Sequence, residues 1–276
     1  MRSTTLLFAA LSLWMVAPAQ SFAQAEILVP AYFYPLSWDE QMNQWDDMQA
    51  ALASGVRITA IMNPTNGPGA DANAPHVKDY AAAVKSFQEA GGKVLGYVYT
   101  CYGVNNCKPE VPPVRTAPEV IADAEKYRDW YGVDGIFLDE LSNVEEERVL
   151  SFYAEVSSGL KALRSDWVVV GNPGAPTPPR FFDFVETIVT FENVPQAHAA
   201  ASAVDWAFNR PPRAQAQLVY NATTADTMRA AVRDAVARNV LYIYVTDDVL
   251  PNQWDRLPTY WLEEVEAVRS ANRPQN

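Results

Sequence analysis

The chain has 276 residues, of which 49% are hydrophobic, and a formal net charge of −12. This length and composition suit one large globular core, and no linker or repeat divides the chain. The acidic balance argues against nucleic acid or an anionic membrane surface as a partner, while a neutral or cationic polymer stays compatible. The alternative interpretation is that the acidity merely keeps the protein soluble.

The first residues are typical of a signal peptide. Arg2 supplies a positive start, and Leu6–Val16 is an apolar run too short to span a bilayer. Small residues at Ser21 and Ala23 predict cleavage after Ala23. We expect a mature domain of residues 24–276 that is periplasmic or secreted, with no membrane contact after cleavage. A retained membrane anchor is the alternative.

Eight short apolar runs follow, each leading into a stretch typical of a helix. They are Ile27–Tyr34, Ile58–Asn63, Val94–Tyr99, Gly135–Glu140, Val168–Asn172, Ile188–Glu192, Gln217–Asn221 and Leu241–Asp247. Strands that alternate with helices predict a parallel sheet, and eight such units predict an α/β protein with a single (β/α)8 barrel, the TIM-barrel fold.

The intervening segments carry one-sided apolar stripes at helical spacing. The clearest is Val77, Tyr80, Val84 and Phe87, which ends at Gly91-Gly92. A Thr223/Thr224 cap begins another. These stripes are expected to be core. Prolines 176, 178 and 179 leave room for little helix after the fifth strand.

Two cysteines, Cys101 and Cys107, flank a short loop after the third strand. In an oxidising compartment they predict a disulfide, worth about 2 kcal/mol for so small a loop. Metal binding is the rival, but the two histidines, His76 and His198, fall in different segments. We therefore expect no metal and no cofactor.

Polar and aromatic side chains gather at the predicted strand ends, which meet at the mouth of such a barrel. Aromatic faces stack on sugar rings, and amides and carboxylates hydrogen-bond hydroxyls. No lysine or arginine stands at these positions. The expected substrate-binding residues are Tyr32, Tyr34, Asn63, Tyr97, Tyr99, Asn172, Asn221 and Asp247.

Glycoside hydrolysis needs two carboxyl groups on either side of the scissile bond. Asp139 and Glu192 end the fourth and sixth strands and are the expected catalytic pair. Glu140 would point away from Asp139 if the strand continued, as a supporting or loop residue. Asp247 and Asp248 are competitors, better suited to substrate hydroxyls or to capping the last helix.

Several blocks together resemble the spherulin-4 family. They are Pro30–Pro35, Gly96–Thr100, Trp130–Glu140, Asn172–Gly174, Thr190–Glu192 and Val245–Asp248 with Leu257–Trp261, in the same order along nearly the whole mature chain. The resemblance implies a (β/α)8 glycoside hydrolase that cleaves α-1,4-linked N-acetylgalactosamine in microbial exopolysaccharides such as galactosaminogalactan. The family's catalytic acids match Asp139 and Glu192, with Glu140 beside the first. The cysteine pair departs from the family pattern.

Resemblance to retaining α-galactosidase-type barrels implies that Asp139 attacks the anomeric carbon while Glu192 acts as acid and then base. Phe191 and Val194 could desolvate Glu192 and raise its pKa. Attack by the substrate's own acetamido group, positioned by Asp139 or Glu140, and an inverting mechanism stay open. We expect endo action by a monomer. The alternative function is a non-catalytic exopolysaccharide-binding or export-assisting protein.

Overall fold

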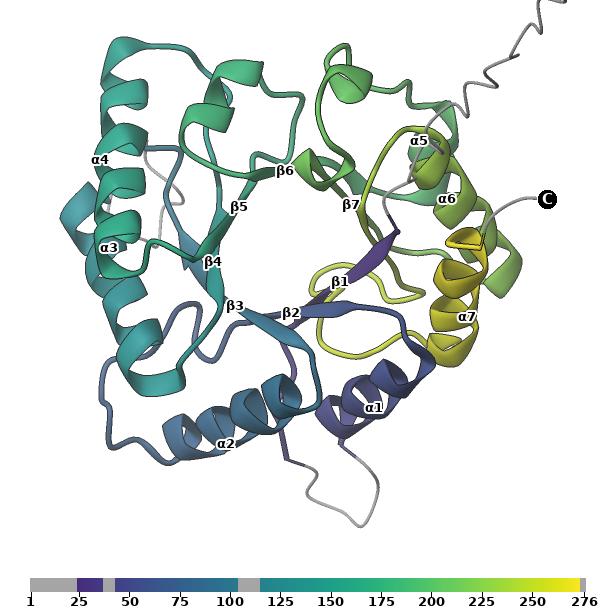
Figure 1. Ribbon diagram of the computed structural model, residues 1–276, viewed down its shortest axis with the longest axis horizontal. Coiled ribbons are helices and arrows are strands. Elements are labelled where there is room, and N and C mark those ends of the chain that lie inside the picture. Colours follow the sequence, from purple (N-terminus) through teal and green to yellow (C-terminus); the bar gives the residue numbers. More distant parts are fainter. Residues whose placement is uncertain (1–23, 37–42, 104–114, 274–276) are drawn as a thin grey trace, which may run out of the picture.

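The computed structural model describes residues 24–36, 43–103 and 115–273. Eight parallel strands close into a barrel in the order β1-β2-β3-β4-β5-β6-β7-β8. The helices lie outside this ring, which is seen end-on in Figure 1. The predicted single (β/α)8 barrel is therefore confirmed.

The strands are short and mostly buried, as the apolar runs predict. They are β1 (Glu26–Ala31), β2 (Ile58–Met62), β3 (Lys93–Tyr99), β4 (Gly135–Asp139), β5 (Val168–Asn172), β6 (Thr187–Asn193), β7 (Gln215–Val219) and β8 (Tyr242–Val245).

Six predicted strand ends were wrong by one to three residues, and only β3 and β5 end where predicted. β2 stops at Met62, β6 runs on to Asn193, and β8 stops at Val245. β1 stops at Ala31 rather than Tyr34, and β7 stops at Val219 rather than Asn221. β4 stops at Asp139, because Glu140 takes a left-handed φ of 54° that no strand continues through. Asn221 is also left-handed, with φ 60°, and begins the turn that follows β7.

The helices bury the predicted stripes against the barrel. They are α1 (Gln44–Ala51), α2 (Pro75–Glu89), α3 (Ala117–Lys126), α4 (Glu147–Leu163), α5 (Pro195–Ala200), α6 (Ala225–Ala237) and α7 (Trp261–Ala271). The side chain of Thr224 caps α6 by accepting from the Thr227 amide. Only a short 3-10 helix, Pro179–Asp183, follows β5, as the prolines predict.

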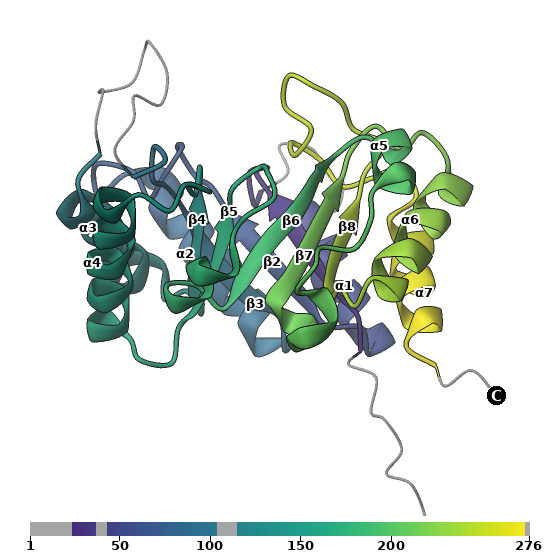
Figure 2. The ribbon, with the colours of Figure 1, turned by 90° about the horizontal axis from the view of Figure 1, so that it is seen from above.

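Strand register sets which side chains meet inside the barrel. Tyr99 of β3 pairs with Asp139 of β4, which pairs in turn with Asn172 of β5. Tyr97 and Phe137 are paired one layer below. Since parallel neighbours in register face the same way, the carboxyl ends of β3, β4 and β5 present one polar layer. Figure 2 shows the β8–α7 connection, in yellow, rising above the strands at one end of the barrel.

Some predictions concern residues outside the described parts of the chain. The signal peptide lies in residues 1–23, and Cys107 lies in residues 104–114, so cleavage after Ala23 and the Cys101–Cys107 disulfide stay predictions. Cys101 itself is buried. Among the described residues, no helix is both long and apolar enough to cross a membrane.

Candidate active site

The two predicted acids meet at the mouth of the barrel around a single amide. Asn172 Nδ2 donates to Asp139 Oδ1 at 3.0 Å and to Glu192 Oε2 at 2.7 Å. The distance between these two carboxylate oxygens therefore cannot exceed the sum of the two hydrogen-bond lengths. Asn172 is 8% exposed, so the bridge is sheltered from bulk water.

Asp139 is oriented by a second donor from the neighbouring strand. The hydroxyl of Tyr97 donates to Asp139 Oδ2 at 2.8 Å. Tyr97 packs edge-on against Tyr32, with ring centroids 5.6 Å apart. Burial and the charges of Asp139 and Glu192 raise the pKa of Tyr32 well above its usual value. Both tyrosines therefore lie close to the acids as neutral hydrogen-bonding groups.

Glu192 owes its inward direction to a bulge in β6. Val189 pairs with Ala216 of β7, but the next paired residue is Phe191, opposite Gln217. The extra residue, Thr190, breaks the two-residue alternation, so Val189 and Glu192 both face the interior although they are three apart. Bulges of this kind often redirect side chains beside active sites.

The bulge also corrects the expected source of burial for Glu192. Phe191 turns outward and packs edge-on against His198 of α5, with centroids 5.0 Å apart. Glu192 is instead covered by the β8–α7 loop, residues 246–260. From this loop Gln253 Nε2 lies 3.5 Å from Glu192 Oε1, and the side chain of Trp254 lies close enough to lower the pKa of the carboxyl.

The electrostatics of the pair favour one protonated acid. Burial raises the pKa of Glu192 above its usual value, and the charge of Asp139 adds to the rise. The hydrogen bonds from Asn172, Gln253 and Trp254 lower that pKa and only partly offset the burial. Two carboxyl groups that share a buried site cannot both ionise at low cost, which is the arrangement that general acid catalysis uses.

Glu140 stays at the same end of the barrel as Asp139. Its backbone oxygen accepts from the Tyr102 amide at 2.8 Å and from Thr100 Oγ1 at 2.8 Å. After burial, the charge of Glu140 is the largest cause of the raised pKa of Tyr102. The left-handed turn at Glu140 therefore holds its carboxylate near the mouth loop that contains Tyr102.

Two expected sugar-binding residues have structural partners in the loops. Asn63 Oδ1 accepts from the Gly67 amide at 2.9 Å, which organises the turn after β2. The hydroxyl of Tyr34 donates to Asp79 of α2, and this bond is the main reason that the pKa of Tyr34 rises to about 12.

Two others are placed at the rim. Tyr99 lies beneath the guanidinium of Arg115, whose carbon is 4.2 Å from the ring centroid. Asn221 is exposed, and its amide donates to the Asp248 oxygen at 2.8 Å.

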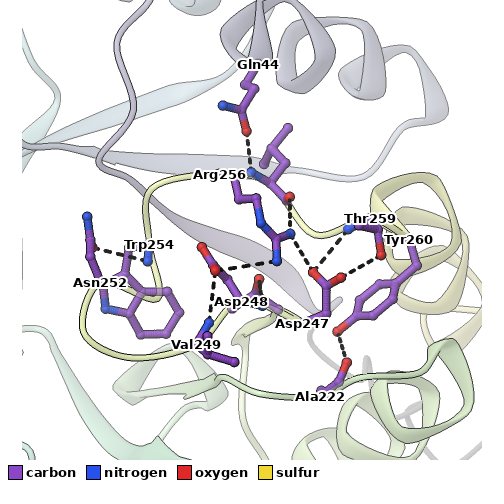
Figure 3. A network of polar contacts seen from close by, with 12 residues as sticks. Gln44, Ala222, Asp247, Asp248, Val249, Asn252, Trp254, Arg256, Thr259 and Tyr260 are labelled. Atoms are coloured by element: carbon purple, nitrogen blue, oxygen red, sulfur yellow. Dashed lines mark hydrogen bonds and ion pairs between the residues drawn. The ribbon is translucent and has the colours of Figure 1, made fainter.

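Asp247 is held in a network of polar contacts with Arg256 and Thr259 (Figure 3). Its Oδ1 accepts from Arg256 Nη1 at 2.7 Å, and its Oδ2 accepts from Thr259 Oγ1 at 2.6 Å. Burial alone would raise the pKa of Asp247, but the bonds from Thr259 and Arg256 outweigh it and lower that pKa.

Inspection of strand ends alone misses several residues at the mouth. Gln253, Trp254 and Arg256 come from the loop after β8, and Arg115 precedes α3. The signal that could have found them is general, since every βα loop of this fold contributes to the mouth. Arg115 pairs with Asp123, and Arg256 pairs with Asp247 and Asp248, so both cations have acidic partners.

A hollow of about 500 Å³ lies beside the polar layer, between the β2–α2 connection and α3. Tyr99, Arg115 and Ala122 are among the residues that line it. Tyr99 is the register neighbour of Asp139, so the hollow adjoins the strand next to the one that carries this acid. Among the described residues, no cluster of histidine, cysteine and acidic side chains could hold a metal ion.

Comparisons with known proteins agree with this geometry. The family model described as Spherulation-specific family 4 matches residues 26–268. Spherulin-4 of Physarum polycephalum is 27% identical over 264 residues, which cover 92% of this chain and 73% of that protein.

Solved structures share the fold. The crystal structure of Aspergillus clavatus Sph3 in complex with GalNAc matches with a TM-score of 0.71 at 22% identity, over 89% of this chain and 98% of that one. GH5_18 from Streptomyces cattleya, in complex with GlcNAc, matches with a TM-score of 0.55 at 15% identity, over 92% and 82% of the two chains.

Proposed function

Because the chain belongs to the spherulin-4 family, we propose that it is a glycoside hydrolase with Asp139 and Glu192 as its acid pair. The observation that carries the proposal is the Asn172 amide in contact with both carboxyl groups at the barrel mouth. A protein that only binds sugar has no need of a buried acid pair, since neutral amides and hydroxyls suffice for hydroxyl recognition.

The two acids take different roles. Glu192, whose pKa burial raises, protonates the glycosidic oxygen and later deprotonates the attacking water. Asp139, held by Tyr97 and Asn172, attacks the anomeric carbon from the other side. Glu140 supports this side of the site from the adjoining turn.

The short bridge supports a retaining mechanism. Carboxyl groups of retaining enzymes lie about 5–5.5 Å apart, whereas inverting enzymes leave about 6.5–9.5 Å for a water. Oxygens that share one amide donor fit the shorter spacing.

The proposed substrate is an exopolysaccharide with α-1,4-linked N-acetylgalactosamine. The relative Sph3 was solved with GalNAc, and the mouth here offers tyrosines, amides and acids that suit a neutral sugar. The hollow beside Tyr99 supports endo action, since it could take a sugar unit beyond the one that is cleaved. Export before action on such a polymer, in monomeric form, is part of the proposal.

The test measures new reducing ends released from galactosaminogalactan by purified protein. Asp139→Asn and Glu192→Gln should each lower turnover by at least about a hundredfold, because each removes a reacting group. Asp166→Asn, which alters an exposed acid paired with Arg164, is the matched control and should keep full activity. Near-wild-type hydrolysis by either active-site variant would remove that residue from its role. Proton NMR of the first product decides whether the anomeric configuration is retained.

A further inference from the structure

The donors that cover Glu192 come from a loop that has no regular secondary structure of its own. Gln253 and Trp254 are 9% and 6% exposed. Gln253 Nε2 lies 3.5 Å from Glu192 Oε1, and the Trp254 side chain lies close enough to lower the pKa of that carboxyl. The positions of these two side chains relative to Glu192 therefore depend on the contacts that hold residues 246–260 against the barrel.

Arg256 joins the two ends of the loop (Figure 3). Its Nη1 lies 2.7 Å from Asp247 Oδ1, and its Nη2 lies 3.4 Å from Asp248 Oδ1. Both aspartates lie just after β8, with only Thr246 between, so the guanidinium ties the far part of the loop to the point where the chain leaves the barrel. A fork with several fixed N–H groups can serve two carboxylates at once, which a lysine ammonium does less well.

Further contacts fix the direction in which the tied loop faces. The Trp254 oxygen accepts from the Tyr32 amide at 3.2 Å, beside the end of β1. The Leu257 amide donates to Gln44 of α1, and the hydroxyl of Tyr260 donates to the Ala222 oxygen at 2.7 Å. The loop thus closes over the β1 side of the mouth, with Trp254 on its inner face.

We propose that Arg256 is a positioning residue for Glu192: by joining the far part of the β8–α7 loop to Asp247 and Asp248 at the start of that loop, it keeps Gln253 and Trp254 on that carboxyl group. The inference rests on the proposed function, in which Glu192 is the acid and base. It also reassigns Asp247, since this side chain would act through Arg256 and not by touching sugar.

The groups that act on Glu192 come from several elements. Asn172 and Asp139 face it from β5 and β4, and Gln253 and Trp254 face it from the loop. Tyr32 beyond β1 and Tyr102 beyond β3 are within its electrostatic reach. On the loop itself, burial and Asp248 raise the pKa of Asp255, which adjoins Arg256.

The test combines kinetics with a direct titration of Glu192. Arg256→Met keeps the side-chain stem but removes the fork, and should lower kcat about ten- to a hundredfold with little change in KM. Loss of the loop's donors would raise the pKa of Glu192, but burial is the largest cause of its rise, so the water that reaches the carboxyl should give a lower pKa overall. This pKa is seen by carboxyl ¹³C NMR and assigned by the absence of the signal in Glu192→Gln. Gln253→Leu, which keeps the cover but removes a donor, should raise that pKa instead. Arg256→Lys should restore part of both readouts.

Arg164→Met is the matched control, because Arg164 is also a half-exposed arginine in a two-contact pair, with Asp166, in the connection between α4 and β5. It should leave both readouts unchanged. A wild-type Glu192 titration in folded Arg256→Met, with or without loss of kcat, would overturn the positioning role. The titration needs no turnover, so it tests the positioning role of Arg256 even if the polymer is not cleaved. Failure to cleave the polymer would count against the proposed hydrolase and not against the positioning role.

Discussion

At the scale of single residues, the site depends on the side-chain amide of Asn172, which lies between the two acids. Asn172 contacts Asp139 and Glu192 from the strand between β4 and β6, and the Gly174 amide donates to its Oδ1 at 3.2 Å. This contact fixes which end of the amide faces the acids, because the oxygen is occupied by a backbone N–H. Asn172 is therefore both a spacer and a donor.

Asn172→Leu should move the alkaline limb of the pH–rate profile to higher pH. The hydrogen bond from Asn172 lowers the pKa of Glu192, so its loss raises that pKa further above the usual value. A general acid works while it is protonated, so activity then persists to higher pH, at a rate lowered by at least about tenfold through lost alignment.

Profiles of kcat/KM against pH for the two proteins provide the measurement. Asn143→Leu is the control, since Asn143 is exposed and donates only to the Pro176 oxygen at 3.2 Å among the hydrogen bonds of the described residues. A shift of the limb to lower pH would show that Asn172 does not act on Glu192 as a donor.

At the scale of secondary-structure elements, the pairing of β1 with β8 closes the barrel and is short, and helix α7 supplies a further hydrogen bond to β8. β1 and β8 pair only at Glu26–Tyr242 and Ile27–Ile243. Beyond that point the Val245 amide donates to Glu264 Oε1 of α7 at 2.7 Å. Glu264 is fully buried, and burial raises its pKa well above the usual value.

Glu264→Gln should gain stability relative to the wild type as pH rises. A folded-state pKa above the unfolded one means that the native state holds the proton more tightly. The free energy of unfolding of the wild type then falls as pH rises above the unfolded value, by up to about 1.4 kcal/mol per pH unit. Glutamine offers the Val245 amide the same acceptor without a proton to lose.

Urea unfolding of both proteins between pH 5 and pH 8 measures the difference. Glu263→Gln, which changes the exposed neighbour on the same helix, should give a difference that does not depend on pH. If the Glu264→Gln difference is equally flat, Glu264 is not held neutral in the folded protein.

At the scale of the whole molecule, charge sets the range of polymers that can approach. The chain has a net charge of −12, and two described cations near the mouth, Arg115 and Arg256, are ion-paired with Asp123, Asp247 and Asp248. An anionic polyuronate would meet repulsion, while a partly deacetylated, cationic galactosaminoglycan would be attracted.

We therefore expect cleavage of N-acetylgalactosamine polymers and little or no cleavage of alginate-like or pectin-like chains. Added salt should weaken binding to a deacetylated polymer and hardly change binding to a fully acetylated one, because salt screens only the charge attraction. Binding and product release measured over a salt series compare the two polymers. Efficient depolymerisation of a polyuronate would contradict both the substrate class and this view of the field.

The sequence by itself determined the barrel, its helices and which strands carry Asp139 and Glu192. Short apolar runs that alternate with helical stripes are compatible with few other folds, and the carboxyl ends of the strands in a parallel barrel all lie at the same mouth. Tyr97, Asp139, Asn172 and Glu192 could thus be grouped in advance from their positions at strand ends.

Only the tertiary structure decided how those groups face one another. Strand alternation could not show that a bulge at Thr190 turns Glu192 inward and Phe191 outward, because one extra residue reverses the pattern. Nor could it show that Arg256 draws a loop over Glu192, since an ion pair between a loop and a strand end depends on folding that brings them together. Local pattern specifies each element, whereas the contacts that tune the acids are made between elements and exist only once the barrel has closed.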